Sequence, residues 1–151
     1  MSLMTWEEAL RLRQGRRLVF TNGVFDLLHV GHLRLLRAAR ELGDLLIVGL
    51  NDDDSVRRLG KGPDRPVNPL EDRAELLSAL RPVDGVVAFS DDTPSRLIAY
   101  LRPEVHVKGG DYREEDLPEA GIIRSYGGEV VIFPTVAGRS TTSMLRRAGL
   151  E

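Results

Sequence analysis

The sequence predicts an α/β domain with an open sheet of about five parallel strands and helices on both faces. Short apolar runs of high β propensity alternate along the chain with stretches of helical period, which is the pattern of a mainly parallel sheet. The length of 151 residues suits one domain with a real core, so we expect residues 1–151 to form a single unit.

The elements can be placed from their ends. Thr5 with Glu8 forms a capping box for the first helix, and Gly43 is expected to end the helix that follows His32. The expected strands are RLVF (17–20), LLIVGL (45–50), GVVAF (85–89), EVHVK (104–108) and EVVIF (129–133).

Two more helix starts follow the second and third strands. Asn68, Pro69 and Glu71 occupy the cap, first and third positions of one helix, and Thr93 with Pro94 opens the next. Residues 114–126 show a weaker helical pattern that a proline and a glycine interrupt. The charged, Gly- and Pro-rich stretch 52–69 is interpreted as a surface loop that closes over a ligand.

Composition excludes several classes of function. The net charge of −2, with 29% charged residues of both signs, provides no basic field for nucleic acid or an anionic membrane. The chain has no cysteine, and its first residues lack the basic start and apolar run of a signal peptide. Because no stretch approaches the roughly 18 apolar residues of a membrane span, we expect a cytoplasmic protein without nucleic-acid or membrane partners.

Polar and glycine residues follow three of the expected strands. In an open α/β sheet, ligands bind beyond the carboxyl ends of the strands, where the strand order reverses. The segments 21–26, 108–112 and 138–142 all occupy such positions, and His29 and His32 follow the first of them. The sequence therefore predicts a binding site at this edge.

His29 and His32 stand at the start of a helix, where unpaired N–H groups and a partial positive charge favour an anion. Gly31 between them lacks a side chain where a phosphate would touch the backbone. Three interpretations are open. Phosphate binding ranks first, a purely structural capping role second, and a metal site third, since no other His, Cys or HExxH-type partner is nearby in the sequence.

The other segments carry similar pairs of interpretations. Ser140, Thr141 and Thr142 are either an ordinary cap or, with Gly138 before them, a second phosphate-holding helix start. Gly109 and its neighbour Gly110 are either a turn or, between Lys108 and Asp111, a backbone that approaches a ligand closely.

Two cations are also ambiguous. Lys61, between two glycines, is either a solvated loop charge or a group that neutralises charge on a triphosphate. Arg73, one turn into its helix, is either an i,i+4 partner of nearby carboxylates or a residue that reaches the site.

The stretch FTNGVFDLLHVGHLRLL resembles the nucleotidyltransferase superfamily of cytidylyltransferases and adenylyltransferases, whose HxGH element is represented by residues 29–32. The ordered series DRPVNPLEDR, VDGVVAF, DDTPSRLI, VKGGDY, GGEVV and GRSTTSML is similar to the D-glycero-β-D-manno-heptose 1-phosphate adenylyltransferase domains of ADP-heptose synthases. Val24 stands where that family usually has Cys, and Arg139 occupies a variable position.

This resemblance implies a Rossmann-like fold and transfer of AMP from ATP to the heptose 1-phosphate, in carbohydrate metabolism and lipopolysaccharide biosynthesis. It also implies Mg²⁺ bound with ATP and a possible homodimer. The implied catalytic residues are His29, His32 and Lys61, and the implied substrate-binding residues are Asp26, Asn68 and Arg73. The implied nucleotide-binding residues are Thr21, Asn22, Gly23, Phe25, Gly31, Lys108, Gly109, Asp111, Gly138, Ser140, Thr141 and Thr142.

Other functions remain open at this point. A glycerol-3-phosphate cytidylyltransferase or an FMN adenylyltransferase would use the same phosphate chemistry with a different base or acceptor. A nucleotide-binding sensor without turnover would use the same helix starts, but it has no need of paired imidazoles beside a lysine.

Overall fold

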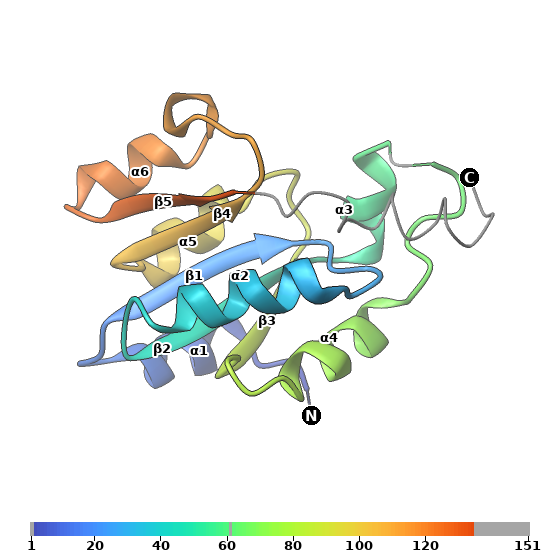
Figure 1. Cartoon of the computed structure of the whole chain (residues 1–151), viewed down its shortest axis with the longest axis horizontal. Helices are drawn as coiled ribbons and strands as arrows, with labels where there is room; N and C mark the ends of the chain where they lie inside the picture. The colour runs from blue at the N-terminus through green and yellow to red at the C-terminus, as the bar shows by residue number, and fades with distance from the viewer. Residues whose placement is uncertain (1, 61, 135–151) are drawn as a thin grey trace.

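The computed structural model describes residues 2–60 and 62–134, which form a five-stranded parallel sheet flanked by helices (Figure 1). The strands are β1 (Leu18–Gly23), β2 (Leu45–Asn51), β3 (Gly85–Phe89), β4 (Val105–Gly109) and β5 (Glu129–Phe133). Their order in the sheet is β3-β2-β1-β4-β5, so the chain runs outward from β1 in one direction and then returns to its other side. The predicted fold class and all five strands are confirmed.

Helices cover both faces of the sheet because consecutive strand residues point to opposite sides. The helices are α1 (Trp6–Arg13), α2 (Val30–Arg40), α3 (Asp53–Arg58), α4 (Leu70–Ser78), α5 (Ser95–Leu101) and α6 (Ala120–Ser125), with a 3₁₀ turn at Glu114–Asp116. The side chain of Val19 packs on one face with α2 and α4, whereas Leu18 and Phe20 pack on the other with α1, α5 and α6.

The predicted helix ends are partly confirmed. Thr5 and Glu8 form the expected reciprocal capping box, with N···O distances of 3.0 and 2.9 Å. Gly43 does not end α2, which stops at Arg40; a Cβ on this glycine would lie 2.7 Å from the carbonyl oxygen of Arg17. A glycine is therefore needed at position 43 because the chain there passes close to the backbone that precedes β1.

The helix start predicted at Asn68 is wrong by one residue. Pro69 occupies the cap position of α4, and no side chain caps this helix. The amide nitrogen Nδ2 of Asn68 instead donates to the carbonyl oxygen of Asp26, at 2.7 Å. The side chain of Asn68, which the local pattern predicts to cap the helix, thus makes a tertiary contact instead. The start predicted at Thr93 and Pro94 is confirmed, with Pro94 at the cap position.

The stretch 52–69 is not wholly a loop, because its first part forms α3. Asp52 caps this helix by accepting from the backbone N–H of Ser55, at 2.8 Å. Acidic residues occupy the first turn and Arg57 and Arg58 the last, which complements the helix dipole. This order of charges, acidic first and basic last, is typical of a short helix, and the prediction of a loop did not take it into account. The weaker stretch 114–126 is split at Pro118, as predicted, but Gly121 does not interrupt it, because this glycine lies inside α6.

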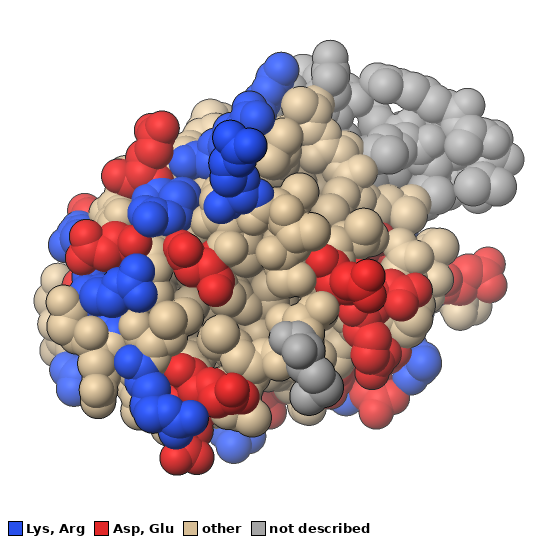
Figure 2. Space-filling model, turned by 90° about the horizontal axis from the view of Figure 1, so that it is seen from below, with Lys and Arg blue, Asp and Glu red and all other residues tan. Residues whose placement is uncertain are grey.

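Charges of both signs occur on the face shown in Figure 2, where Lys and Arg side chains lie among Asp and Glu side chains. None of the helices in the described ranges has the length and apolar character needed to cross a membrane.

Candidate active site

A cavity of about 810 Å³ opens at the carboxyl edge of the sheet, at the point where the strand order reverses. In the described chain the pairing of β1 with β4 ends at Phe20 and His106, although both strands continue for three more residues. The side-chain oxygen Oδ1 of Asn22, in this unpaired part of β1, is buried without a hydrogen-bond partner in the described chain. The sheet is thus opened where a ligand would enter.

His29 and His32 line this cavity at the start of α2, and their rings lie against each other with centroids 3.8 Å apart. The backbone N–H of His29 donates to Nδ1 of His32, at 3.2 Å. The backbone N–H of Gly31 donates to Nδ1 of His29, at 3.1 Å. Since both Nδ1 atoms accept, the proton of each neutral imidazole is on Nε2.

Burial lowers the pKa of His32 from its ordinary 6.5 to about 4, and the charge on His29 acts in the same direction. Burial also lowers the pKa of His29. Both rings are therefore neutral near pH 7, and each offers one Nε2–H donor. The capping role proposed as the second interpretation is present, and it coexists with a donor function because the two roles use different nitrogens.

The loop between β1 and α2 is shaped by close contacts. Phe25 adopts a left-handed backbone with φ of 49°, which is uncommon for a residue other than glycine. Its ring lies 5.1 Å from the ring of His32, measured between centroids. A Cβ on Gly23 would lie 3.0 Å from the Phe25 ring. Gly23 and Phe25 thus support the position of the histidines as well as lining the cavity.

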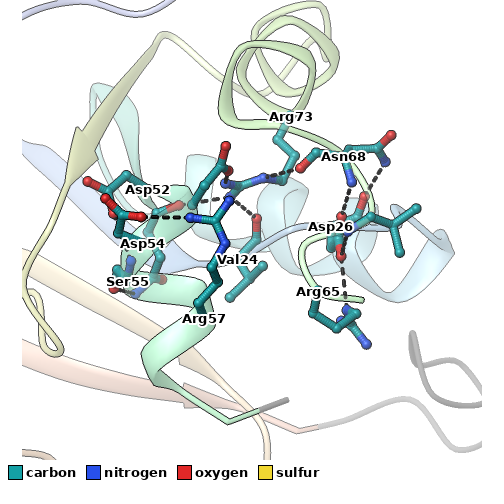
Figure 3. Close-up of polar contacts among 12 residues, drawn as sticks. Val24, Asp26, Asp52, Asp54, Ser55, Arg57, Arg65, Asn68 and Arg73 are labelled. Atoms are coloured by element: carbon teal, nitrogen blue, oxygen red, sulfur yellow. Dashed lines mark hydrogen bonds and ion pairs between the residues drawn. The ribbon is translucent and has the colours of Figure 1, made fainter. Parts of the chain in front are cut away.

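Asp26 is a buried anchor at the same edge (Figure 3). Its carboxylate accepts from Arg65 Nε at 2.9 Å, from the N–H of Val67 at 2.7 Å and from the N–H of Asn68 at 2.8 Å. The carboxylate therefore ties the segment before α4 to the loop after β1. Asp26 lines the cavity, but its oxygens are occupied by these donors.

Arg73 is completely buried and does not line the cavity. Figure 3 shows its guanidinium among the groups that it contacts. Its Nη1 donates to the carbonyl oxygens of Val24 and Asn51, both at 2.9 Å, and its Nε to that of Asn68, at 2.9 Å. Its Nη2 pairs with Asp53 Oδ1 at 2.6 Å. The prediction that Arg73 binds substrate directly finds no support in this geometry, and neither does the i,i+4 alternative.

The far wall of the cavity follows β4. The ammonium of Lys108 lies 5.2 Å from the centroid of the Tyr112 ring. A Cβ on Gly109 would lie 3.2 Å from Leu35 of α2, so the strand approaches this helix closely. Gly110 has a φ of 119°, a conformation that side chains rarely permit, which explains the second glycine.

Glu119 also lines this wall, and its Oε1 lies 3.0 Å from Nε2 of the buried His106. Burial alone would raise the pKa of Glu119, but the hydrogen bond and electrostatic contact with His106, the backbone hydrogen bond and the nearby ammonium of Lys108 outweigh it and lower the pKa. The carboxylate is therefore kept ionised.

Most predicted residues that can be placed meet at this cavity. Lining it are Asn22, Gly23, Phe25, Asp26, His29, Gly31, His32, Lys108 and Gly109, whereas Thr21, Asn68, Arg73 and Asp111 do not line it. Lys61, Gly138, Arg139, Ser140, Thr141 and Thr142 lie outside the described residues.

Sequence reasoning missed several lining residues, among them Arg65, Tyr112, Glu119 and the segment 92–94. Residues 92–94 follow the strand β3, so the rule that ligands bind beyond the carboxyl ends of strands could have found them. Glu119 carried no comparable local signal.

A metal centre is not preformed in the described ranges, where no group of three or more His, Asp or Glu side chains is placed to hold an ion.

The comparisons with known proteins agree on one relationship. The cytidylyltransferase-like family matches residues 20–135. The D-beta-D-heptose 1-phosphate adenylyltransferase of Bordetella bronchiseptica is 55% identical over 133 residues, which cover 88% of this chain and 82% of that protein. The bifunctional protein HldE of Streptomyces coelicolor is 58% identical over 130 residues, 86% of this chain, and the chain spans only 28% of its length.

One solved structure is similar to this chain in fold. The lipopolysaccharide core biosynthesis protein from Thermoplasma volcanium superposes with a TM-score of 0.67 at 29% sequence identity, covering 81% of this chain and 98% of that one.

Proposed function

The chain belongs to the cytidylyltransferase-like family, and from this membership we propose that it transfers AMP from ATP to D-glycero-β-D-manno-heptose 1-phosphate and releases pyrophosphate. The name of the Bordetella relative, which shares most of its length with this chain, supports the choice of nucleotide and acceptor. The structural observation that carries the proposal is the pair of cavity-lining imidazoles at the start of α2, whose Nδ1 atoms both accept backbone N–H groups, so that each ring keeps its Nε2–H as a donor.

In the proposed reaction, an oxygen of the acceptor phosphate attacks the α-phosphorus of ATP. A new P–O bond forms, the bond from the α-phosphorus to the bridging oxygen breaks, and pyrophosphate leaves with the electron pair. No protein nucleophile is needed, so the enzyme aligns the reactants and stabilises the charge that moves toward the leaving group. His29 and His32 donate their Nε2–H groups to phosphate oxygens beside the helix N-terminus.

Mg²⁺ enters this proposal with ATP. The cavity carboxylates of Asp26 and Glu119 are already engaged by Arg65, backbone amides and His106, so they do not form a resident metal site. An ion that bridges phosphate oxygens and keeps its waters needs few protein ligands and lowers the charge of the triphosphate.

Several parts of the proposal concern residues outside the described ranges. Lys61 is proposed to offset charge on the triphosphate, and Ser140, Thr141 and Thr142, after Gly138, to bind phosphates. A cytoplasmic location and a homodimer are also proposed; light scattering at several protein concentrations tests the dimer.

The deciding experiment is a crossed assay of pyrophosphate release. ATP and CTP are each combined with the heptose 1-phosphate, glycerol 3-phosphate and FMN, and kcat/KM is compared for every pair. We expect ATP with the heptose phosphate to lead clearly. Preference for CTP with glycerol 3-phosphate, or for ATP with FMN, would replace the substrate assignment, and tight ATP binding without pyrophosphate from any acceptor would indicate a sensor.

A further inference from the structure

Arg65 is one of two cations among the described residues that line the cavity, the other being Lys108 on the far wall. Its side chain is only 13% exposed, although it belongs to the segment between α3 and α4 rather than to a helix or strand. Arginine side chains are rarely buried to this extent without an ion-pair partner. The partner of Arg65 is the buried carboxylate of Asp26.

The contact between Arg65 and Asp26 uses one nitrogen. Arg65 Nε donates to Asp26 Oδ2 at 2.9 Å, and within the described residues neither Nη1 nor Nη2 has a hydrogen-bond acceptor. This differs from the bidentate arrangement that guanidinium and carboxylate groups often form. The guanidinium is fixed in orientation while its terminal N–H groups stay available to a second anion.

Asp26 does not depend on Arg65 for its own position. Its carboxylate also accepts from the backbone N–H groups of Val67 and Asn68, and Asn68 Nδ2 binds the Asp26 carbonyl oxygen. The segment before α4 therefore stays attached to Asp26 through these three bonds if the guanidinium is removed. The fold therefore has little need of Arg65 to hold this segment in place.

The two histidines do not offset the negative charge of the phosphate groups, and a cation at the cavity can do so. His29 and His32 have lowered pKa values and are neutral near pH 7, so they donate hydrogen bonds without offsetting charge. A phosphate monoester and a triphosphate must nevertheless approach each other for the transfer proposed above. A guanidinium is the side chain best suited to bind phosphate oxygens at such a place.

We propose that Arg65 binds a phosphate group of a reactant through its terminal N–H groups, with Asp26 as the residue that positions it. The inference rests on the proposed nucleotidyl transfer for its substrates. The phosphate belongs either to the sugar 1-phosphate or to ATP, and the experiment separates these sources.

The test uses two substitutions in the full-length protein, Arg65→Gln and Arg65→Lys, with Arg11→Gln as the matched control. Arg11 is an exposed arginine of α1 that, among the residues the structure describes, pairs with Glu7 of the same helix. Kinetic constants are measured for ATP and for the heptose 1-phosphate. Calorimetry gives the affinities for ATP, the heptose 1-phosphate and inorganic pyrophosphate, and circular dichroism gives Tm.

For Arg65→Gln we expect affinity for one phosphate compound to fall about 10- to 100-fold, the range for a hydrogen bond to a charged group. Tm stays close to that of the control variant. A raised KM for the sugar phosphate alone identifies the acceptor, and a raised KM for ATP with weaker pyrophosphate binding identifies the triphosphate. Arg65→Lys keeps the positive charge but loses the planar pair of terminal N–H donors, so its phosphate affinity should fall less. It is also the variant to measure if the Arg65→Gln protein does not fold.

Unchanged affinities and kinetic constants in both variants would overturn the proposal. A large loss of Tm with unchanged affinities would make Arg65 structural. If the wild-type protein releases no pyrophosphate with any acceptor, the proposed function fails, while the calorimetric comparison still decides whether Arg65 binds phosphate.

Discussion

Replacing Arg73 with methionine tests whether this arginine stabilises the fold or binds substrate. Methionine fills a similar volume but removes the donors to Val24, Asn51 and Asn68 and the partner of Asp53. Leaving a buried carbonyl without a donor costs about 1–3 kcal/mol, and two of these carbonyl contacts are fully buried. Asp53 is 30% exposed and regains some hydration.

These contributions predict a loss of about 4 kcal/mol in the free energy of unfolding, within the range for removing one partner of a buried charged network. For a chain of this size such a loss lowers Tm by about 8–16 °C. Urea and thermal unfolding followed by circular dichroism measure it. Arg11→Met, on the exposed surface of α1, should stay within about 0.5 kcal/mol of the wild type.

Two results would refute this reasoning about Arg73. A loss below about 1 kcal/mol would mean that the four contacts are not maintained in solution. An unchanged Tm with a large rise in KM for the sugar phosphate, measured well below the unfolding temperature, would restore the prediction of direct substrate binding.

Four further substitutions, at three residues, test other parts of the structure. His32→Ala should lower kcat about 10²-fold, the scale for one preorganised donor, with a smaller effect on ATP affinity; near-normal kcat would remove His32 from catalysis. Because burial lowers the pKa of His32 to about 4, the unfolded chain binds this proton more tightly, so the free energy of unfolding should fall as pH drops from 6.5 toward 4. Urea titrations should show a shallower fall for His32→Gln, and an unchanged slope would contradict the assigned cause. His106→Leu leaves the buried Glu119 without its partner and should cost about 3 kcal/mol at neutral pH; adding Glu119→Gln should recover part of this loss, whereas simple additivity would show that the two residues are not coupled.

The sheet was predictable because its signals are local. Each strand is a short apolar run, and the alternation of runs and helical stretches leaves few arrangements other than a parallel sheet. The capping box of Thr5 and Glu8 also lies within one turn, so its residues identify each other. Asn68 carried an equally good cap signal, but Asp26, distant in sequence, offered its side chain a different partner.

The candidate site was predictable only where its residues follow strands. His29 and His32 adjoin β1, and Lys108 and Gly109 end β4, so the topology alone brings them together. The role of Arg73 depends on carbonyls from two other segments, which no local pattern encodes. Its spacing gave one usable signal, since Arg73 lies three residues after Leu70 and four before Leu77, on the apolar face of its helix.

The short pairing between β1 and β4 has a consequence for how the protein opens in solution. Six residue pairs join β1 to β2, whereas two pairs, Val19 with Val105 and Phe20 with His106, join β1 to β4. The pairing of β1 with β4 also closes a longer loop of the chain than the pairing of β1 with β2, so it costs more conformational entropy. The sheet is therefore expected to behave as two cooperative units, β1-β2-β3 and β4-β5, that separate in sub-global fluctuations before global unfolding.

Native-state hydrogen exchange would show this separation directly. Backbone amides of β2 should exchange only through global unfolding, and those of β4 and β5 at a lower free energy that depends less on denaturant. Since the cavity lies at the junction of the two units, a bound nucleotide that contacts both of them would raise the protection of β4 and β5 more than that of β2.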